Sequence, residues 1–324
     1  MAKYMVIGDC HLTDPERAPL NRKGHWTEEL FAKLEFIVEL AKKNKCDAIL
    51  QNGDLYHLPS YSANSVALIQ RTHDVLTSAG IPVIIVPGNH ELRHLNVDDD
   101  LPKHALGALG RMEGIELISK QSSILSDVYG IPYLQDWSTL PTWIDEYNTY
   151  REEHPEIERG IIITHASLFP RKDEPIYDFI ADEDLADMLK YPTTVMHGHL
   201  HFSQGARTYG DVEIINYGAI SRGSLHKETI NRKPQVYIYN TATGKHKTYN
   251  IPVKPPEEVF ILELHELEKE RTEKLTEFLS GLDTDSTGVV TSVEQMVEHV
   301  TTTQDVSSDV KVLVSELLDF AQEK

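Results

Sequence analysis

The sequence predicts an α/β fold, because short apolar runs of strand length alternate with amphipathic helical stretches up to about residue 220. A second observation supports this prediction: five of the apolar runs stop abruptly at Asp, Asn or His residues rather than continuing into a helix. The chain has 324 residues, enough for one large domain with a sizeable core and an additional smaller region.

The predicted strands are short β-rich runs bounded by glycine, proline or polar residues. In chain order they are "YMVI" at 4–7, "DAILQNG" at 47–53, "PVIIVPG" at 82–88, "GIIITH" at 160–165 and "TTVMHG" at 193–198. Residues 233–252 predict a β-hairpin that turns at Thr243 and Gly244. Pro255 and Pro256 then mark a linker.

Two amphipathic helices are predicted between the first strands. In residues 27–45 the apolar side chains recur at helical spacing, with Thr27 as the N-cap and basic residues at the end. The apolar face of this first helix consists of Leu30, Phe31, Leu34, Ile37, Val38 and Ala41. Residues 62–80 show the same pattern and end at Gly80.

The charge distribution divides the chain into two regions. The formal net charge is −20, and residues 251–324 contribute 17 Asp and Glu against 6 Lys and Arg, or −11 of that total. We therefore expect one domain over residues 1–253 and an acidic C-terminal capping or partner-binding region over 254–324. An acidic chain is a poor nonspecific ligand of nucleic acid, since phosphates are neutralised by Lys and Arg.

Basic side chains nevertheless occur in the loops expected near the strand ends, where they would form either a local basic rim or a scattered solvated surface. They are Arg17, Arg22, Lys23, Arg93, Lys103, Arg171, Lys172, Arg222 and Lys227.

Cysteine usage and hydropathy favour a cytoplasmic protein. Cys10 and Cys46 are the only cysteines, too few for a disulfide framework, and both are expected to be free thiols. No stretch is apolar enough to span a membrane, and the first residues do not resemble a signal peptide.

Potential metal ligands follow all five strands. The motifs are "VIGDCH", "LQNGDLYH", "IVPGNHE", "IITHAS" and "VMHGHLH". In open α/β sheets, residues after the carboxyl ends of the strands converge on one edge. Asp9 and His11 are two positions apart, as are His199 and His201, so extended backbone would place each pair on one face. Oxygen and nitrogen donors without thiols suit Mn, Fe or Zn rather than Ca. Cys10, between two such residues, is expected to pack inward.

In this order, the D-x-H, GD, GNHE, lone His and GHxH motifs resemble the calcineurin-like metallophosphoesterase family over residues 4–222. The resemblance implies a two-sheet sandwich flanked by helices, followed here by a small C-terminal α/β or α cap. It also implies two divalent metal ions, most simply Mn²⁺, that share Asp54. One ion would be held by Asp9, His11, Asp54 and His201, and the other by Asp54, Asn89, His165 and His199.

Within this family, a metal-bound hydroxide attacks the phosphoester. The resemblance assigns His90 of GNHE to the scissile phosphate or the leaving oxygen. His57 would line the catalytic site in the nuclease branch; otherwise it is an ordinary loop residue. A protein-phosphatase function is weakened, because "GDLYHLPSYS" replaces the GDxVDRG motif of those enzymes.

The motifs "GDLYH" and "NYGAISRGSL" (216–225) are similar to the SbcD-type DNA-repair nucleases of bacteria and phages. That similarity implies a DNA exonuclease or endonuclease of double-strand-break repair or recombination, in the cytoplasm of a bacterium or a phage-infected cell. It also implies DNA, an SbcC-type ATPase and a second copy of the chain as partners. The alternatives are a small-molecule phosphodiesterase or phosphatase and, less favoured because every ligand position is filled, a non-catalytic scaffold.

Residues 283–294, "DTDSTGVVTSVE", resemble an EF-hand loop, with Asp283 and Asp285 first and third and Glu294 twelfth. Position 5 is Thr287 rather than a carboxylate or amide, and no second loop pairs with it. A plain connection between helices is the alternative.

Overall fold

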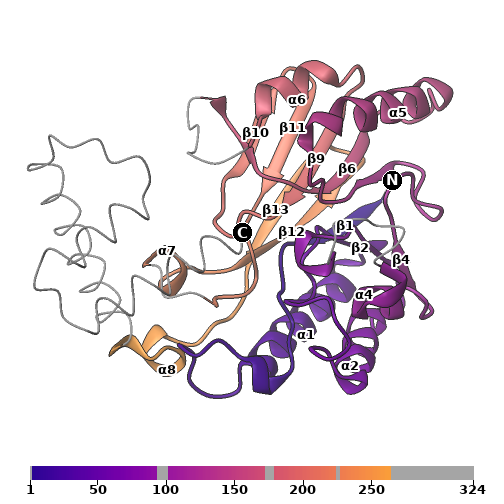
Figure 1. Ribbon diagram of the computed structural model, residues 1–324. Coiled ribbons are helices and arrows are strands. Elements are labelled where there is room, and N and C mark those ends of the chain that lie inside the picture. The colour runs from indigo at the N-terminus through magenta and orange to yellow at the C-terminus, as the bar shows by residue number, and fades with distance from the viewer. Residues whose placement is uncertain (1, 93–100, 172–178, 224–226, 264–324) are drawn as a thin grey trace, which may run out of the picture. The chain divides into compact units, whose positions relative to one another are not determined.

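Two β-sheets face each other across an apolar layer, and helices cover their outer faces (Figure 1). The computed structural model describes residues 2–92, 101–171, 179–223 and 227–263. The first sheet has the order β13 (Lys245–Asn250), β12 (Gln235–Asn240), β1 (Lys3–Ile7), β2 (Ala48–Gln51), β3 (Val83–Ile85) and β4 (Ile115–Leu117). The second has the order β10 (Gly205–Tyr209), β11 (Val212–Asn216), β9 (Thr193–Gly198), β6 (Gly160–His165) and β5 (Val128–Ile131). The predicted two-sheet α/β fold is confirmed.

Helices and short segments complete the architecture. The helices are α1 (Trp26–Asn44), α2 (Val66–Thr77), α4 (Ala105–Leu109), α5 (Leu140–Glu153), α6 (Asp182–Met188), α7 (Lys227–Ile230) and α8 (Pro256–Val259). The two-residue strands β7 (Leu168–Phe169) and β8 (Ile180–Ala181) pair with each other. Helices α1, α2 and α4 pack on the first sheet, and α5 and α6 on the second (Figure 1). Among the described residues, no helix is both long and apolar enough to cross a bilayer.

Strand periodicity explains the layers, because successive side chains point to opposite faces of a sheet. In β1, Tyr4 and Val6 face the layer between the sheets, whereas Met5 and Ile7 pack toward the helices. The side chains of the other buried parallel strands alternate in the same way. Because both faces of these strands are buried, their sequences are continuous apolar runs.

Most of the predicted elements are observed. The helix expected at 27–45 is α1, and its six predicted apolar residues are at most 1% exposed. Thr27 as its N-cap was wrong: His25 is the N-cap, and the Thr27 hydroxyl donates to the carbonyl oxygen of Thr13. The predicted hairpin is β12 and β13, with Gly244 at φ 62° in the turn. Cys10 and Cys46 are free and buried, as expected.

The C-terminal prediction is only partly within the described residues. Residues 259–261 pair with the loop before α1: Phe260 is fully buried and forms a β-bridge with Arg22, and Val259 and Phe260 pack against Ile230. The remainder of the predicted cap, including the EF-hand-like residues 283–294, lies outside the described residues.

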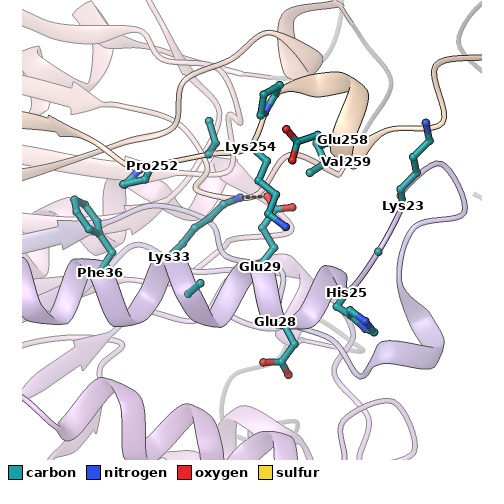
Figure 2. A pocket seen from close by; sticks show the side chains of 14 residues that line it. Lys23, His25, Glu28, Glu29, Lys33, Phe36, Pro252, Lys254, Glu258 and Val259 are labelled. Carbon is teal, nitrogen blue, oxygen red and sulfur yellow. Dashed lines mark ion pairs between the residues drawn. The ribbon is translucent and has the colours of Figure 1, made fainter.

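A buried charge cluster ties α1 to the loop after β11. The Lys33 ammonium lies 2.8 Å from a Glu29 carboxylate oxygen and donates to the carbonyl oxygen of Ile220 at 3.1 Å (Figure 2). Glu29 also pairs with Arg22. Ile220 in turn donates its backbone N–H to the carbonyl oxygen of Asp9. The cluster therefore helps to position the backbone behind the first predicted ligands.

Burial lowers the pKa of Lys33 to about 8, although Glu29 partly opposes this effect. Between pH 8 and the ordinary lysine pKa, the unfolded state binds more protons than the folded state, so stability should rise with pH. The free energy of unfolding of wild type, minus that of Lys33→Met, should increase by about 2 kcal/mol from pH 7.5 to 9.5 in urea titrations. The matched control, Lys42→Met at an exposed position of α1, should show no such increase. A flat Lys33 difference would contradict a buried ammonium.

Candidate metal centre

The seven predicted ligands lie where the carboxyl ends of parallel strands from both sheets meet. Asp9 and His11 follow β1, Asp54 follows β2, Asn89 follows β3, His165 ends β6, and His199 and His201 follow β9. The His165 Nδ1–H donates to the carbonyl oxygen of Asn52 at 2.8 Å, which joins the two sheet edges. Strand topology thus brings residues almost 200 positions apart into one site.

Four of these side chains form one half of the cluster. His11 Nε2 and His201 Nε2 are 2.9 Å apart. His201 Nε2 lies 3.5 Å from Asp9 Oδ2, and His11 Nε2 lies 3.8 Å from Asp54 Oδ2. The donor atoms therefore face a common space.

The other half is built around Asn89. Its Oδ1 lies 3.0 Å from His165 Nε2 and 3.1 Å from His199 Nδ1. His165 Nε2 is also 3.2 Å from Asp54 Oδ2, so the Asp54 carboxylate borders both halves. The shared role of Asp54 that the family resemblance implies stays a prediction.

Three of the predicted ligands have left-handed backbone conformations. His11 and Asp54 have φ of 54°, and His199 has φ of 74°. Among the other non-glycine residues that the structure describes, only Lys45, at the C-cap of α1, has a positive φ. Such conformations are unfavourable for L-residues and cluster at functional sites. The sequence-based reason for pairing Asp9 with His11, and His199 with His201, was therefore wrong, because the backbone at His11 and at His199 is not extended. The Asp9 and His11 side chains meet through the bend at His11.

The protonation states leave most imidazoles able to bind a cation. Burial lowers the pKa of His11 and of His201, and lowers that of His199 to about 4. Burial alone would also lower the pKa of His165, but the carboxylates of Asp54 and Asp9 outweigh it and raise this pKa to about 9. Cation binding at His165 must therefore release a proton.

The donor chemistry fits divalent cations. Three groups have ligand atoms within 4.8 Å of one another: Asp9, His11 and His201; Asp9, Asp54 and His165; and His11, His57 and His90. Asp9 and Asp54 are at most 1% exposed, so their charges are removed from water. Buried carboxylates are stabilised by pairing or by metal coordination. The cluster thus has the donor set of a site for divalent cations.

His90 and His57 lie beside the predicted ligands. The His90 Nδ1–H donates to the carbonyl oxygen of His57 at 2.6 Å, which leaves Nε2 directed toward the cluster, 3.9 Å from Asp54 Oδ2. The two imidazole rings stack with centroids 5.1 Å apart. His57 therefore orients His90 through its backbone and its ring.

Sequence reasoning missed Glu91, which supports the cluster from behind. Its carboxylate accepts the backbone N–H groups of Asp54 at 3.0 Å, Tyr56 at 2.8 Å and Gly88 at 2.8 Å. Glu91 is 1% exposed, and burial together with the Asp54 charge raises its pKa to about 8. The GNHE motif contains this residue, but only the folded chain brings the Asp54 backbone to it.

A cavity of about 350 Å³ opens beside the histidines. Arg17 lines it together with His57 and His90, and so does Arg232, which the sequence analysis did not select. A larger hollow of about 780 Å³ lies between α1 and residues 252–259 and contains none of the predicted ligands (Figure 2).

The predicted basic rim is therefore only partly correct. Arg22 and Arg222 are 8% and 1% exposed and donate to backbone carbonyls, so they are not available to a ligand. Arg171 pairs with Asp184. Arg93 and Lys172 lie outside the described residues. Among the members of that set whose side chains the structure describes, only Arg17 lines the site cavity.

Glu91→Gln should weaken Mn²⁺ binding 10- to 100-fold, because residues that orient metal ligands typically have effects of this size. It should also lower the free energy of unfolding by about 2 kcal/mol, since an amide cannot accept all three backbone N–H groups. Calorimetry with Mn²⁺ and urea unfolding measure both effects. Glu116→Gln is the matched control, as Glu116 also accepts a backbone N–H, from Ser123. It should lower stability without changing Mn²⁺ affinity; equal Mn²⁺ affinities in all three proteins would exclude the role of Glu91.

Several curated proteins are similar to this chain. The protein named DNA double-strand break repair protein Mre11 is 33% identical over 91 residues in Aeropyrum pernix, covering 28% of this chain and 21% of the relative. The Mre11 protein of Saccharolobus solfataricus is 22% identical over 209 residues, covering 62% and 50%. That of Encephalitozoon cuniculi is 24% identical over 255 residues, covering 69% and 42%. The matches thus span between about a fifth and a half of these relatives.

Among solved structures, a dimetal phosphatase from Danio rerio superposes with a TM-score of 0.45 at 12% identity, covering 78% of this chain and 99% of that one. The family model described as calcineurin-like phosphoesterase matches residues 2–203, which contain all seven predicted ligands. Such a match indicates a metal-dependent hydrolase. The chain therefore belongs to the calcineurin-like phosphoesterase family.

Proposed function

We propose that the chain is a metal-dependent phosphodiesterase and the nuclease subunit of a DNA repair or recombination complex. The observation that carries this proposal is the cavity beside the metal centre. Two arginines, Arg17 and Arg232, line it with four histidines, and no carboxylate is among its described lining residues. A polyanionic strand would find cations there despite the acidic total charge. The similarity to proteins named for double-strand-break repair supports the same substrate class.

Two divalent cations, Mn²⁺ in this proposal, would be held by the seven residues in the sets that the family resemblance implies. When bound, they would neutralise the phosphate and activate water for attack. Asp54 would face both cations. Glu91 would hold the Asp54 backbone in its left-handed conformation through the hydrogen bonds to Asp54 and Gly88.

His90 would act on the leaving oxygen. Since its Nδ1–H is committed to the carbonyl oxygen of His57, only Nε2 is free to hold or donate a proton. His90 lines the same cavity as the two arginines. The side chains of this chain thus make two contributions: His90 holds a proton at Nε2, and the two arginines place positive charge beside the bound strand.

The proposed partners are DNA, an SbcC-type ATPase and a second copy of the chain, with residues 254–324 as the capping or partner-binding region. These rest on the family resemblance and on the Mre11-named relatives. The competing function is a phosphodiesterase or phosphatase that acts on small molecules, and it uses the same ligands.

His90→Gln should lower kcat for Mn²⁺-dependent cleavage of end-labelled linear DNA by about 100-fold, because general acid catalysis contributes 10²- to 10⁴-fold. Its Mn²⁺ affinity by calorimetry should stay close to wild type, because His90 is not among the proposed ligands. His73→Gln, an imidazole on α2 that contacts the Glu113 carbonyl, is the matched control. Single- and double-stranded DNA are compared with bis-p-nitrophenyl phosphate and p-nitrophenyl phosphate. Wild type that hydrolyses the esters but leaves DNA intact would favour the competing function.

Binding of single-stranded DNA should weaken with salt, with a slope of log K against log[salt] of about −0.7 per phosphate contacted. Arg17→Gln should make this slope shallower by about 0.7, because one such contact is lost. Arg71→Gln, a surface arginine paired with Glu28 on α1, should leave the slope unchanged. Fluorescence anisotropy in EDTA gives the slopes without cleavage. Equal slopes for wild type and Arg17→Gln would remove Arg17 from the DNA contact.

A further inference from the structure

One wall of the cavity beside the metal centre consists of residues that, apart from Arg232, have no role in the proposed function. Besides the histidines, its lining includes Thr13, Trp26, Ser221, Gly223 and Arg232. These residues come from the loop after β1, the start of α1 and the segment after β11. They therefore meet only in the folded chain.

Three buried polar atoms of these lining residues have no hydrogen-bond partner. They are Thr13 Oγ1, Trp26 Nε1 and Arg232 Nε. Thr13 is 1% and Trp26 3% exposed, so neither group is solvated at the protein surface. Buried polar groups are almost always hydrogen-bonded in native proteins, so unpaired ones next to a cavity indicate a ligand or ordered water.

All three atoms can donate, and two of them can only donate: an indole N–H and a guanidinium N–H have no acceptor capacity. The complementary ligand is therefore an acceptor. Arg17 and Arg232 add positive charge to the same cavity. The Arg232 guanidinium is fixed by donating to the carbonyl oxygens of His201 and Ser221, so its charge stays beside a predicted ligand. Donors and cations without a carboxylate favour an anion.

Trp26 and its neighbours form an apolar surface next to these donors. The guanidinium of Arg22 lies over the indole, 4.8 Å from the ring centroid. Gly223 contributes no side chain, and a Cβ there would already be 3.6 Å from the indole and 3.8 Å from Pro19. The indole, Pro19 and Gly223 thus form an apolar part of the wall next to the donors.

We propose that this cavity is a second phosphate subsite, in which Thr13, Trp26 and Arg232 bind the phosphodiester group next to the scissile one. The inference rests on the proposed nuclease function and deepens it: the site would prefer a strand with consecutive phosphates to an ester with a single phosphate. Free phosphate offers the same acceptor chemistry, so the test separates these two sources.

The test compares Thr13→Val and Trp26→Phe, which remove one donor each. Valine keeps the shape of threonine, whereas phenylalanine is smaller than tryptophan, so Trp26→Phe is read against its matched control. The measured quantity is kcat/KM for a short oligothymidylate divided by kcat/KM for bis-p-nitrophenyl phosphate, which has one phosphate. This ratio should fall about tenfold in each variant, the size expected for one hydrogen bond to a charged group. The matched controls are Thr208→Val on the exposed strand β10 and Trp143→Phe on α5. Neither residue lines the cavity, and the ratio should not change.

A second readout does not depend on catalysis. Anisotropy of labelled oligothymidylate in EDTA should show the same tenfold loss of affinity in the two variants. An unchanged ratio, or equal losses on both substrates, would overturn the subsite, because the variants would then act on the shared metal centre or not at all.

If wild type hydrolyses bis-p-nitrophenyl phosphate but neither cleaves nor binds the oligonucleotide, the nuclease function fails by itself. Calorimetry with inorganic phosphate in EDTA then decides the subsite. Binding heat that Thr13→Val abolishes would support a site for free phosphate, and no heat in wild type would overturn the subsite.

Discussion

The buried carboxylate of Asp54 is the constraint on which the rest of the site depends. It is 1% exposed, it follows a glycine at φ 91°, and its own backbone is left-handed. A Cβ at Gly53 would lie 2.4 Å from the His165 ring, and one at Gly88 would lie 2.2 Å from the Asp54 carboxylate. Positions 53 and 88, which both lie next to the Asp54 carboxylate, therefore require glycine. An unfavourable backbone and a desolvated charge persist only where surrounding contacts, ion pairs or a bound cation compensate for them.

The sandwich provides those contacts. Its inner apolar layer holds the two sheets at a fixed separation, and the carboxyl ends of β1, β2 and β3 then face those of β6 and β9. The hydrogen bond from His165 to the Asn52 carbonyl crosses between the sheets. Sheets are rigid because their ladders and packing are cooperative, so ligands at their ends are better positioned than ligands on long loops. The fold thus determines the site geometry even though each ligand belongs to a short connection.

The sequence could predict which side chains gather at this site because two local signals coincide in the seven candidates: a strand-length apolar run, and a side chain able to bind metal directly after it. Their role as metal ligands stays a prediction. It could not predict the left-handed backbone at His11, which depends on hydrogen bonds from residues 10 and 11 to the carbonyl of Asp54. Arg22 and Arg222 were misjudged for a related reason. Composition gives the number of arginines, but burial under Phe260 is a tertiary property.

Total charge is a weak guide to the substrate of this chain. At physiological ionic strength, charges more than about 8 Å apart in solvent are largely screened from each other. The excess acid in residues 251–324 accounts for −11 of −20 by sequence, whereas Arg232 and Arg17 line the cavity itself. A partly buried guanidinium is screened much less than an exposed carboxylate. Charged groups that line a cavity contribute most to the potential inside it, so the total charge of an acidic chain does not by itself exclude an anionic ligand there.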